Sequence, residues 1–580
     1  QEVKSIRYAK RWRIEPSDSA AYRRGELVRP VKQLVFYIDS LMPVKWNPYI
    51  KAGAESWNKA FEKIGFKDVI CVKEFPKNDT LFNANSFDCM TIRYSASWLN
   101  SAQTTIHSDT RTGEILNASI LINANMISVQ YADRIGATVA IDPRVRTTVF
   151  PQEIQGELIQ AAIAQAVGTG LGLAMNWGAS CAYPVDSLRS ASFTQKYGLA
   201  SSVMGGVIIN DVATEEDVRN GVCLVNTKPG PYDELVIKYL YQPIYASSLQ
   251  EEKETLDSWI REHTGDPYYA YIRNQSRFDS DPRNSRGSLG DDHLKSFDYM
   301  LPNVRKGFEN YYSWFAKEDR DFLMRRRVHS ALSERLSGRI YAILSYIGGI
   351  YLNDIREKDA IPSYSMVDRE KQKAALSKAL ELAKNLDWVD DTAHLNEFEI
   401  SDKKADRLRL DIFNGIFGRL PYVEVCTERF PDAAYTASEY LDDIYGIVWE
   451  GVLKHRPLEN FDRALQTAFL ESIISTSTAT APIGSFKASK TGFAATGKPE
   501  INLAALRNGG KVDMKMHSLQ NAEEVAGFSS IPPIYTNQTK IAAYYFDLLM
   551  RTKDMLKKAI STAPEADRSH YDLLIYRINK

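Results

Sequence analysis

Residues 165–175, QAVGTGLGLAM, have the spacing of a metal-binding helix and turn but lack its usual side chains. Positions 165 and 169 are four residues apart and therefore share one face of a helix. Gly172 permits a sharp turn that would return a third ligand, at position 175, to the same ion. A general base at position 166 would complete a centre that activates water for hydrolysis. The residues present at the four positions are Gln165, Ala166, Thr169 and Met175.

The side chains at these four positions cannot perform the zinc chemistry for which their spacing is suited. Zinc binds thiolates, imidazoles and carboxylates, whereas Gln165, Thr169 and Met175 offer an amide, a hydroxyl and a thioether. Ala166 cannot take a proton from water. The chain has eight histidines, but none lies between residues 108 and 262, so no neighbouring imidazole can substitute. We therefore expect no bound metal, no cofactor and no catalytic group at these positions.

The segments around the frame resemble a family of bacterial zinc-dependent metalloproteases of the metzincin type, known mainly from Bacteroidetes. In that family the helix reads HExxHxxGxxH and a methionine-containing turn follows it. The resemblance covers most of residues 1–350 and, more faintly, the helical remainder. The matching segments are GLGLAMNWGASCAYPVDSLRSASFTQKYGLASSVM (170–204), RWRIEPSD (11–18), RRGELVRPVKQLVFYID (23–39), DTRTGEILNASI (109–120), GPYDELVIKYLYQPI (230–244) and LGDDHLKSFDYMLPNVRK (289–306).

Carried onto this chain, the resemblance assigns the zinc ligands to positions 165, 169 and 175 and the general base to position 166. Of the family's frame, Gly172 remains, and Met204 is the methionine of the turn, followed by Gly205 and Gly206 instead of Asp-Tyr. The resemblance thus implies a peptidase scaffold that has lost its zinc site. It also implies export to the periplasm or cell surface.

The resulting functional hypothesis is a catalytically inactive pseudopeptidase that binds a peptide or protein in the former cleft, or acts as a scaffold. An extended peptide can add to an edge strand through main-chain hydrogen bonds without any metal. The strand predicted near residues 115–123 would offer Ile115, Asn117, Ser119 and Leu121. The alternative is a hydrolase with a substitute site in the same cleft, for which the candidates are His107 and residues 289–293.

Other polar clusters have simpler interpretations. Glu153 and Glu157 belong to the first turns of the helix, roughly 12–18 Å from position 165 by helical rise. Asp186 and Arg189 suit a local ion pair or a helix cap. The polar loop at 274–292 lacks the EF-hand spacing, so a solvated loop is a simpler interpretation than a calcium site. Its candidate ligands, with the residue that follows it, are Asp279, Asp281, Asp291, Asp292 and His293.

The predicted fold class is α+β. Strands are predicted at 33–39, 66–74 and 87–97, and a fourth within 112–126 after a turn at Thr112-Gly113. With helices at 46–65 and 149–172, this gives a mixed twisted sheet packed on the site helix. A large all-helical region follows, with a break at 355–373, a Gly/Ser-rich loop near 477–498 and one long final helix at 534–561. We predict an N-terminal extension (1–30), a metzincin-like domain (31–260), a helical region (261–400) and a C-terminal helical domain (401–580).

Composition excludes several classes of function. The 580 residues carry a net charge of −1, which argues against a nucleic-acid partner. No apolar run of about 18 residues predicts a membrane span. The five cysteines are scattered without a CxxC pair, so a structural zinc cage is not expected. The first residues show no apolar segment of the signal-peptide type, and the pattern does not specify an oligomeric state.

Overall fold

The computed structural model describes residues 8–76, 78–79, 81–99, 102–272, 280–284, 288–355, 357, 359–394, 403–477 and 538–579. The chain forms two compact units. The first comprises Gln1–Asn274 and Asp279–Gly415, and the second includes Ile416–Lys580. The boundaries predicted at residues 30, 260 and 400 stay predictions.

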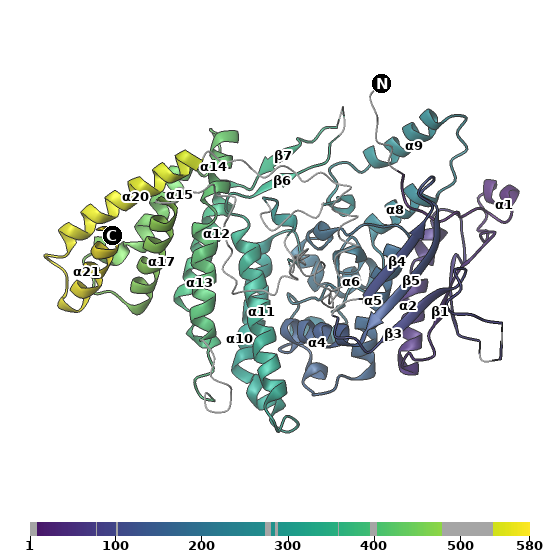
Figure 1. Cartoon of the computed structure of the whole chain (residues 1–580), viewed down its shortest axis with the longest axis horizontal. Helices are drawn as coiled ribbons and strands as arrows, with labels where there is room; N and C mark the ends of the chain where they lie inside the picture. The colour runs from purple at the N-terminus through teal and green to yellow at the C-terminus, as the bar shows by residue number, and fades with distance from the viewer. Residues whose placement is uncertain are drawn as a thin grey trace, which may run out of the picture. The chain divides into compact units, whose positions relative to one another are not determined.

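A five-stranded mixed sheet lies in the first unit (Figure 1). Its strands are β1 (Leu34–Ile38), β2 (Ile70–Glu74), β3 (Met90–Ser95), β4 (Ala102–Ser108) and β5 (Ile115–Asn123). The order is β2-β1-β3-β5-β4, with β4 antiparallel to β5 and the other pairs parallel. The predicted mixed sheet is confirmed. We did not predict β4, because its sequence AQTTIHS contains a single large apolar residue and no alternation.

Two helices, α2 (Asn47–Glu55) and α5 (Gln152–Gly170), pack against each other on one face of the sheet. Alternate strand residues such as Phe36, Ile92 and Ile120 share a core with Ile163 of α5. The helix predicted at 46–65 is interrupted at residues 56–57 and continues as α3 (Asn58–Glu62). The strand predicted at 112–126 ends at residue 123, where α4 (Ala124–Thr138) begins. A run of apolar residues does not distinguish these two conformations.

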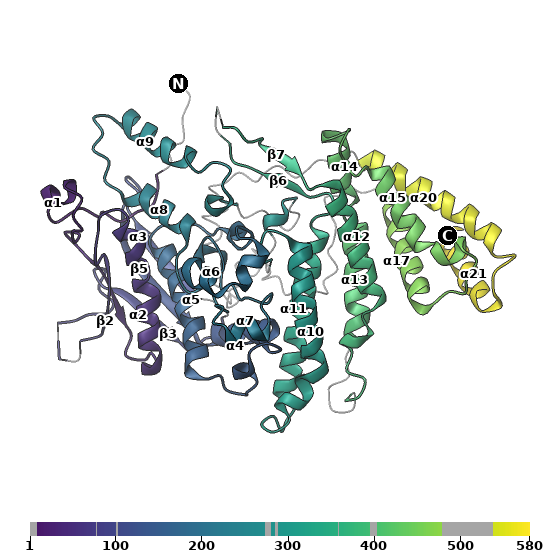
Figure 2. The same ribbon diagram turned by 180° about the vertical axis from the view of Figure 1, so that it is seen from behind.

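The rest of the first unit is mostly helical (Figure 2). A short antiparallel sheet of β6 (Ile350–Leu352) and β7 (Tyr364–Met366) interrupts the region that we predicted as purely helical. The helices are α1 (Ser19–Arg23), α6 (Ala191–Tyr197), α7 (Glu215–Arg219), α8 (Pro231–Tyr241), α9 (Leu249–Arg261), α10 (His293–Phe315), α11 (Leu323–Leu344), α12 (Arg369–Lys384) and most of α13 (Lys404–Phe417).

In its described part the second unit consists of helices. They are α14 (Leu420–Arg429), α15 (Ala437–Val448), α16 (Glu450–Leu453), α17 (Asn460–Ser477), α20 (Gln538–Ala559) and α21 (Glu565–Asn579). The predicted final helix corresponds to α20, but α21 follows it after a break at Pro564. Residues 534–537 and most of the loop predicted at 477–498 lie outside the described residues.

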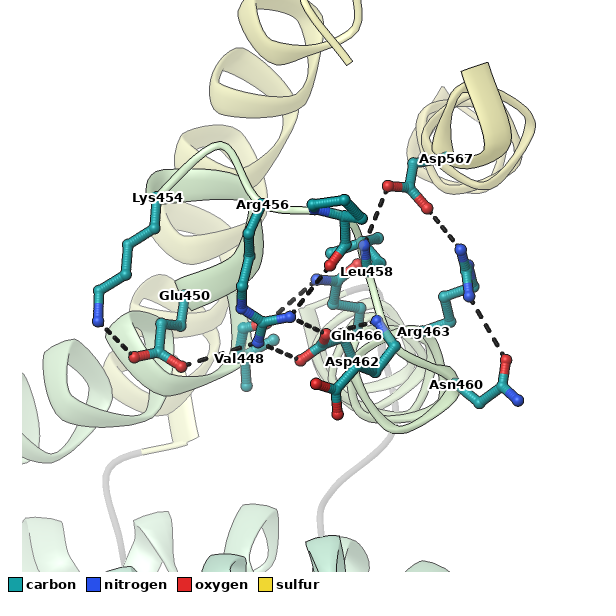
Figure 3. A network of polar contacts seen from close by, with 12 residues as sticks. Val448, Glu450, Lys454, Arg456, Leu458, Asn460, Asp462, Arg463, Gln466 and Asp567 are labelled. Carbon is teal, nitrogen blue, oxygen red and sulfur yellow. Dashed lines mark hydrogen bonds and ion pairs between the residues drawn. The ribbon is translucent and has the colours of Figure 1, made fainter. Parts of the chain in front are cut away.

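Buried carboxylates join the helices of the second unit (Figure 3). Asp462 at the start of α17 accepts two hydrogen bonds from Arg456, at 2.6 and 2.9 Å. Asp567 of α21 accepts from Arg463 at 2.5 Å and from the backbone N–H of Leu458 at 3.0 Å. These contacts hold α21 against the loop that enters α17.

None of the described helices has both the length and the apolar character that crossing a bilayer requires.

Candidate functional site

The site helix α5 is buried around most of its circumference. Apolar residues such as Ile154, Leu158, Ile163 and Val167 are fully enclosed, which is the pattern of a helix in the centre of a domain. Pro151 stands at the N-cap, immediately before the first turn. The carbonyl of Ala164 accepts a hydrogen bond from the indole of Trp57 at 2.8 Å. The helix that carries positions 165, 166 and 169 is therefore firmly held.

A sharp turn ends α5 at Gly172. The backbone N–H of Leu173 donates to the carbonyl of Gly168 at 3.1 Å, which closes the helix end. Gly172 has φ +90°, a conformation that favours glycine. A Cβ atom added there would lie 2.1 Å from the carbonyl oxygen of Lys10. The turn directs the following chain back toward the helix.

The turn brings Gln165 and Met175 together. The side-chain amide of Gln165 donates to Sδ of Met175 at 3.3 Å, across ten residues of sequence. Thr169, one turn further along α5, donates its hydroxyl to the carbonyl of Gln165 at 3.4 Å. All three side chains are half-buried. The first and third ligand positions thus converge as the spacing requires, and an amide–thioether contact lies between them.

The position of the general base carries no functional side chain. Ala166 is buried, and its carbonyl accepts the hydroxyl of Thr104 on β4 at 2.9 Å. A methyl group can neither hold nor transfer a proton. The backbone of Ala166 instead joins α5 to β4.

Met204 lies directly beneath α5, on the turn Val203–Gly205 (η5). It is fully buried, and a Cβ atom added at Gly168 would meet its Sδ at 2.6 Å. The carbonyl of Met204 accepts the backbone N–H of Asn176 at 3.1 Å. The turn therefore packs on the site helix and on the segment just after Met175. Gly206 follows at φ +99°.

A buried carboxylate that the sequence analysis missed holds this turn. Asp233 of α8 accepts the hydroxyl of Ser202 at 2.6 Å and the backbone N–H of Val203 at 2.9 Å. It also accepts the backbone N–H of Gly230 at 2.9 Å, as a helix-capping residue does. Burial raises the pKa of Asp233 to about 7. The only local signal was an acid in the first turn of a helix, which does not reveal a distant contact.

The proposed peptide-binding edge needs correction. Ile115, Asn117, Ser119 and Leu121 lie on β5, which is an inner strand between β3 and β4. The edge strand on this side of the sheet is β4, and β2 forms the other edge. Its Thr104 faces α5, whereas Thr105 and His107, on the opposite face, are exposed. The error followed from overlooking β4, which covers the side of β5 that we took as free.

Two acids, Glu157 of α5 and Asp186 after it, contact cations on other elements. Oε2 of Glu157 lies 3.8 Å from the buried guanidinium of Arg134, and Glu153 is exposed. Asp186 and Arg189 do not pair with each other. Asp186 accepts from Lys295 at 2.5 Å, and Arg189 donates to Asp217 at 2.7 Å. Of the two predicted roles, a local ion pair or a helix cap, the local ion pair is therefore wrong.

Most of the described part of the polar loop is buried, although Asp291 is exposed. Asp281 accepts from Arg283 at 2.7 Å, Asp291 accepts the backbone N–H of Val185, and Asp292 caps α10. The ring of His293 is buried, with Nε2 3.0 Å from the carbonyl of Pro282. Asp279 lies outside the described residues.

No substitute metal site is formed by the residues that the structure describes. Among them, no three His, Cys, Asp or Glu side chains are grouped so that they could hold a metal ion. His107 is exposed on β4 and His293 is enclosed near α10, so the two candidates of the alternative hypothesis do not form a cluster with acids.

Comparison with known protein families gives one match. A family model described as Met-zincin matches residues 147–456, more than half of the chain. The chain belongs to the Met-zincin family. The Met-zincin match includes α5, the turn with Met204, and α8, and it confirms the predicted resemblance at this level. No curated protein and no solved structure has significant similarity to the chain.

Proposed function

We propose that this Met-zincin is a non-catalytic member of its family, whose former active site serves in binding a peptide or protein. The observation that carries the proposal is the contact between Gln165 and Met175 at 3.3 Å. The scaffold around the zinc positions persists, but an amide and a thioether meet where the frame would place two imidazoles. Neither group suits Zn²⁺.

The residue at position 166 supports the same conclusion. Hydrolysis by a zincin requires a group that takes a proton from the attacking water. Ala166 has none, and its surroundings are the core of the domain.

The edge strand β4 is the surface on which we place the binding function. It runs beside α5, to which Thr104 ties it, and ends the sheet. An extended segment can add to such an edge by main-chain hydrogen bonds, and no metal is needed. The exposed Thr105 and His107 would then lie on the sheet face beside the added strand. The resemblance of the sequence to exported metalloproteases leads us to place this activity in the periplasm or on the cell surface.

The metal content of the protein tests the loss of catalysis. After equilibration with zinc and removal of the excess, we expect less than about a tenth of an equivalent by elemental analysis. We also expect no hydrolysis of casein. One tightly held zinc ion per chain, together with casein hydrolysis that a chelator abolishes, would refute the proposal.

The binding role needs a separate experiment. Peptides selected on the protein from a displayed random library should slow amide hydrogen exchange in residues 102–108. Selected peptides that instead protect only segments remote from β4 and α5 would exclude the edge strand as the binding surface.

A further inference from the structure

Asp233 joins two parts of the first unit that are distant in sequence. Its carboxylate is fully buried and contacts three donors: the hydroxyl of Ser202 and the backbone N–H groups of Val203 and Gly230. Two of these donors belong to the segment that enters the Met204 turn. The side chain therefore ties the start of α8 to the turn beneath α5.

This carboxylate has no cation to balance it among the described residues. The titratable groups that face it are Glu234 and Tyr232 on α8 and Tyr183 from the neighbouring loop. Glu234 is itself an acid, and it pairs outward with Lys63 at 2.5 Å. An ionised Asp233 is thus a buried charge with hydrogen bonds but no counter-ion, which is an unfavourable state.

Protonated Asp233 can keep contacts with the same three groups without placing an unbalanced charge in the core. Its Oδ2 still accepts the two backbone N–H groups, while the bond with Ser202 reverses: the proton on Oδ1 is donated to the hydroxyl oxygen, which donates to Oδ1 when the acid is ionised. That oxygen also accepts the backbone N–H of Met204 at 2.9 Å. The neutral carboxyl therefore completes a chain of hydrogen bonds from α8 into the turn.

We propose that protonated Asp233 is the closed state of a clamp on the Met204 turn, and that ionisation of Asp233 loosens the turn. Met204 packs on Gly168, and its carbonyl binds the segment after Met175, so a looser turn disturbs the former metal site directly. The pKa of about 7 places this change near neutral pH. The clamp acts on the shape of the site and does not depend on whether a peptide binds there.

Hydrogen exchange of the full chain, followed by mass spectrometry and corrected for the intrinsic pH dependence of exchange, tests the clamp. The opening equilibrium of the 199–206 segment should rise about tenfold between pH 6 and pH 8, because the closed state holds its proton more tightly than the open state. Segments of α5 remote from the turn, such as 152–160, should show no such rise.

The variant Asp233→Asn distinguishes the two protonation states. Its amide mimics the neutral acid, since one oxygen accepts the backbone N–H groups and the NH₂ group donates to Ser202. Exchange in Asp233→Asn should therefore match the wild type at pH 6 and stay unchanged at pH 8. Asp233→Ala should exchange fast at both pH values.

Two results would overturn the clamp. If wild-type exchange at 199–206 slows with rising pH while Asp233→Asn exchanges fast throughout, then it is the ionised form of Asp233 that holds the Met204 turn closed. If the wild type shows no pH dependence, Asp233 is only structural. Ser202→Ala provides a second check in case position 233 does not tolerate change, and it should reduce the protection at pH 6.

Discussion

The side-chain amide of Gln165 lies 3.3 Å from the sulfur of Met175, although Met175 follows the end of α5 and the turn at Gly172. The two side chains meet because the chain turns sharply at the left-handed Gly172 and then packs on the buried Met204 turn. This contact shows that the end of α5 and the turn after it bring positions 165 and 175 together, as their spacing predicted.

We first predict that imidazoles can be restored to this frame. The triple variant Gln165→His/Thr169→His/Met175→His should bind about one equivalent of zinc, since three imidazoles and a water complete a tetrahedral site. Elemental analysis and competition with a chromogenic chelator measure the binding. The double variant Gln165→His/Thr169→His, which keeps Met175, is the matched control and should bind zinc far more weakly.

Equal zinc binding by the double and triple variants would show that position 175 does not reach the metal. Addition of Ala166→Glu to the triple variant should produce measurable casein hydrolysis, because it supplies the missing proton acceptor.

The spacing of residues along the sequence predicted the features of this site that depend on residues close together in the chain. The helix α5 and the turn at Gly172 that follows its end are local consequences of periodicity and of glycine's conformational freedom. The sheet was predicted where strands such as β1 and β2 are apolar. β4 was missed because its polar sequence becomes a strand through pairing with β5, which local pattern does not show.

Long-range polar partners could not be predicted for the same reason. The acids near residue 290 were interpreted as a solvated loop, yet Asp281 and Asp292 are neutralised by Arg283 and Lys371, the second of which is far along the chain. The tie from Asp233 to Ser202 spans thirty-one residues. Charge and spacing identify such groups as polar but do not reveal what they contact.

The second prediction concerns Gly172. Gly172→Ala should lower the free energy of unfolding by about 2–4 kcal/mol, because the new methyl group meets the carbonyl of Lys10 in a left-handed backbone conformation. Gly25→Ala is the matched control. Gly25 follows the end of α1 with a similar φ of +83° but open space around it, so only about 1 kcal/mol of backbone strain is expected. Urea denaturation measures both. Equal losses would mean that the contact with Lys10 relaxes freely.

The third prediction concerns pH and His293. Because a carbonyl only accepts, Nε2 of His293 carries the proton that bonds Pro282, and Nδ1 is buried without a described partner. Burial lowers the pKa of His293 to about 4. The unfolded chain takes up this proton near pH 6.5 and the folded chain does not, so stability is lost as pH falls from 6.5 toward 4.

This linkage should cost about 2–3 kcal/mol between pH 7.5 and pH 4.5. His293→Gln should reduce the difference between the two pH values by that amount, even though it lowers stability at pH 7.5. His107→Gln, at an exposed position, should leave the difference unchanged. A wild-type pH dependence that persists in His293→Gln would assign the effect to another group.

The fourth prediction compares two ion pairs of the second unit. Asp567 is buried and accepts hydrogen bonds from both Arg463 and the backbone N–H of Leu458 (Figure 3). Asp567→Ala should destabilise this unit by about 2–3 kcal/mol, somewhat less than a fully buried pair because Arg463 is partly exposed. The control is Asp442→Ala, which breaks the pair with Arg551 at 2.5 Å, where both side chains are more than half exposed.

Asp442→Ala should cause little measurable change, since water replaces an exposed partner at almost no cost. Thermal unfolding monitored by circular dichroism compares the two variants under identical conditions. The pairs have the same length, so a large difference in melting temperature would follow from burial and from the backbone N–H that Asp567 also satisfies. Similar melting temperatures would mean that water reaches Asp567 and that α21 is held mainly by its apolar face.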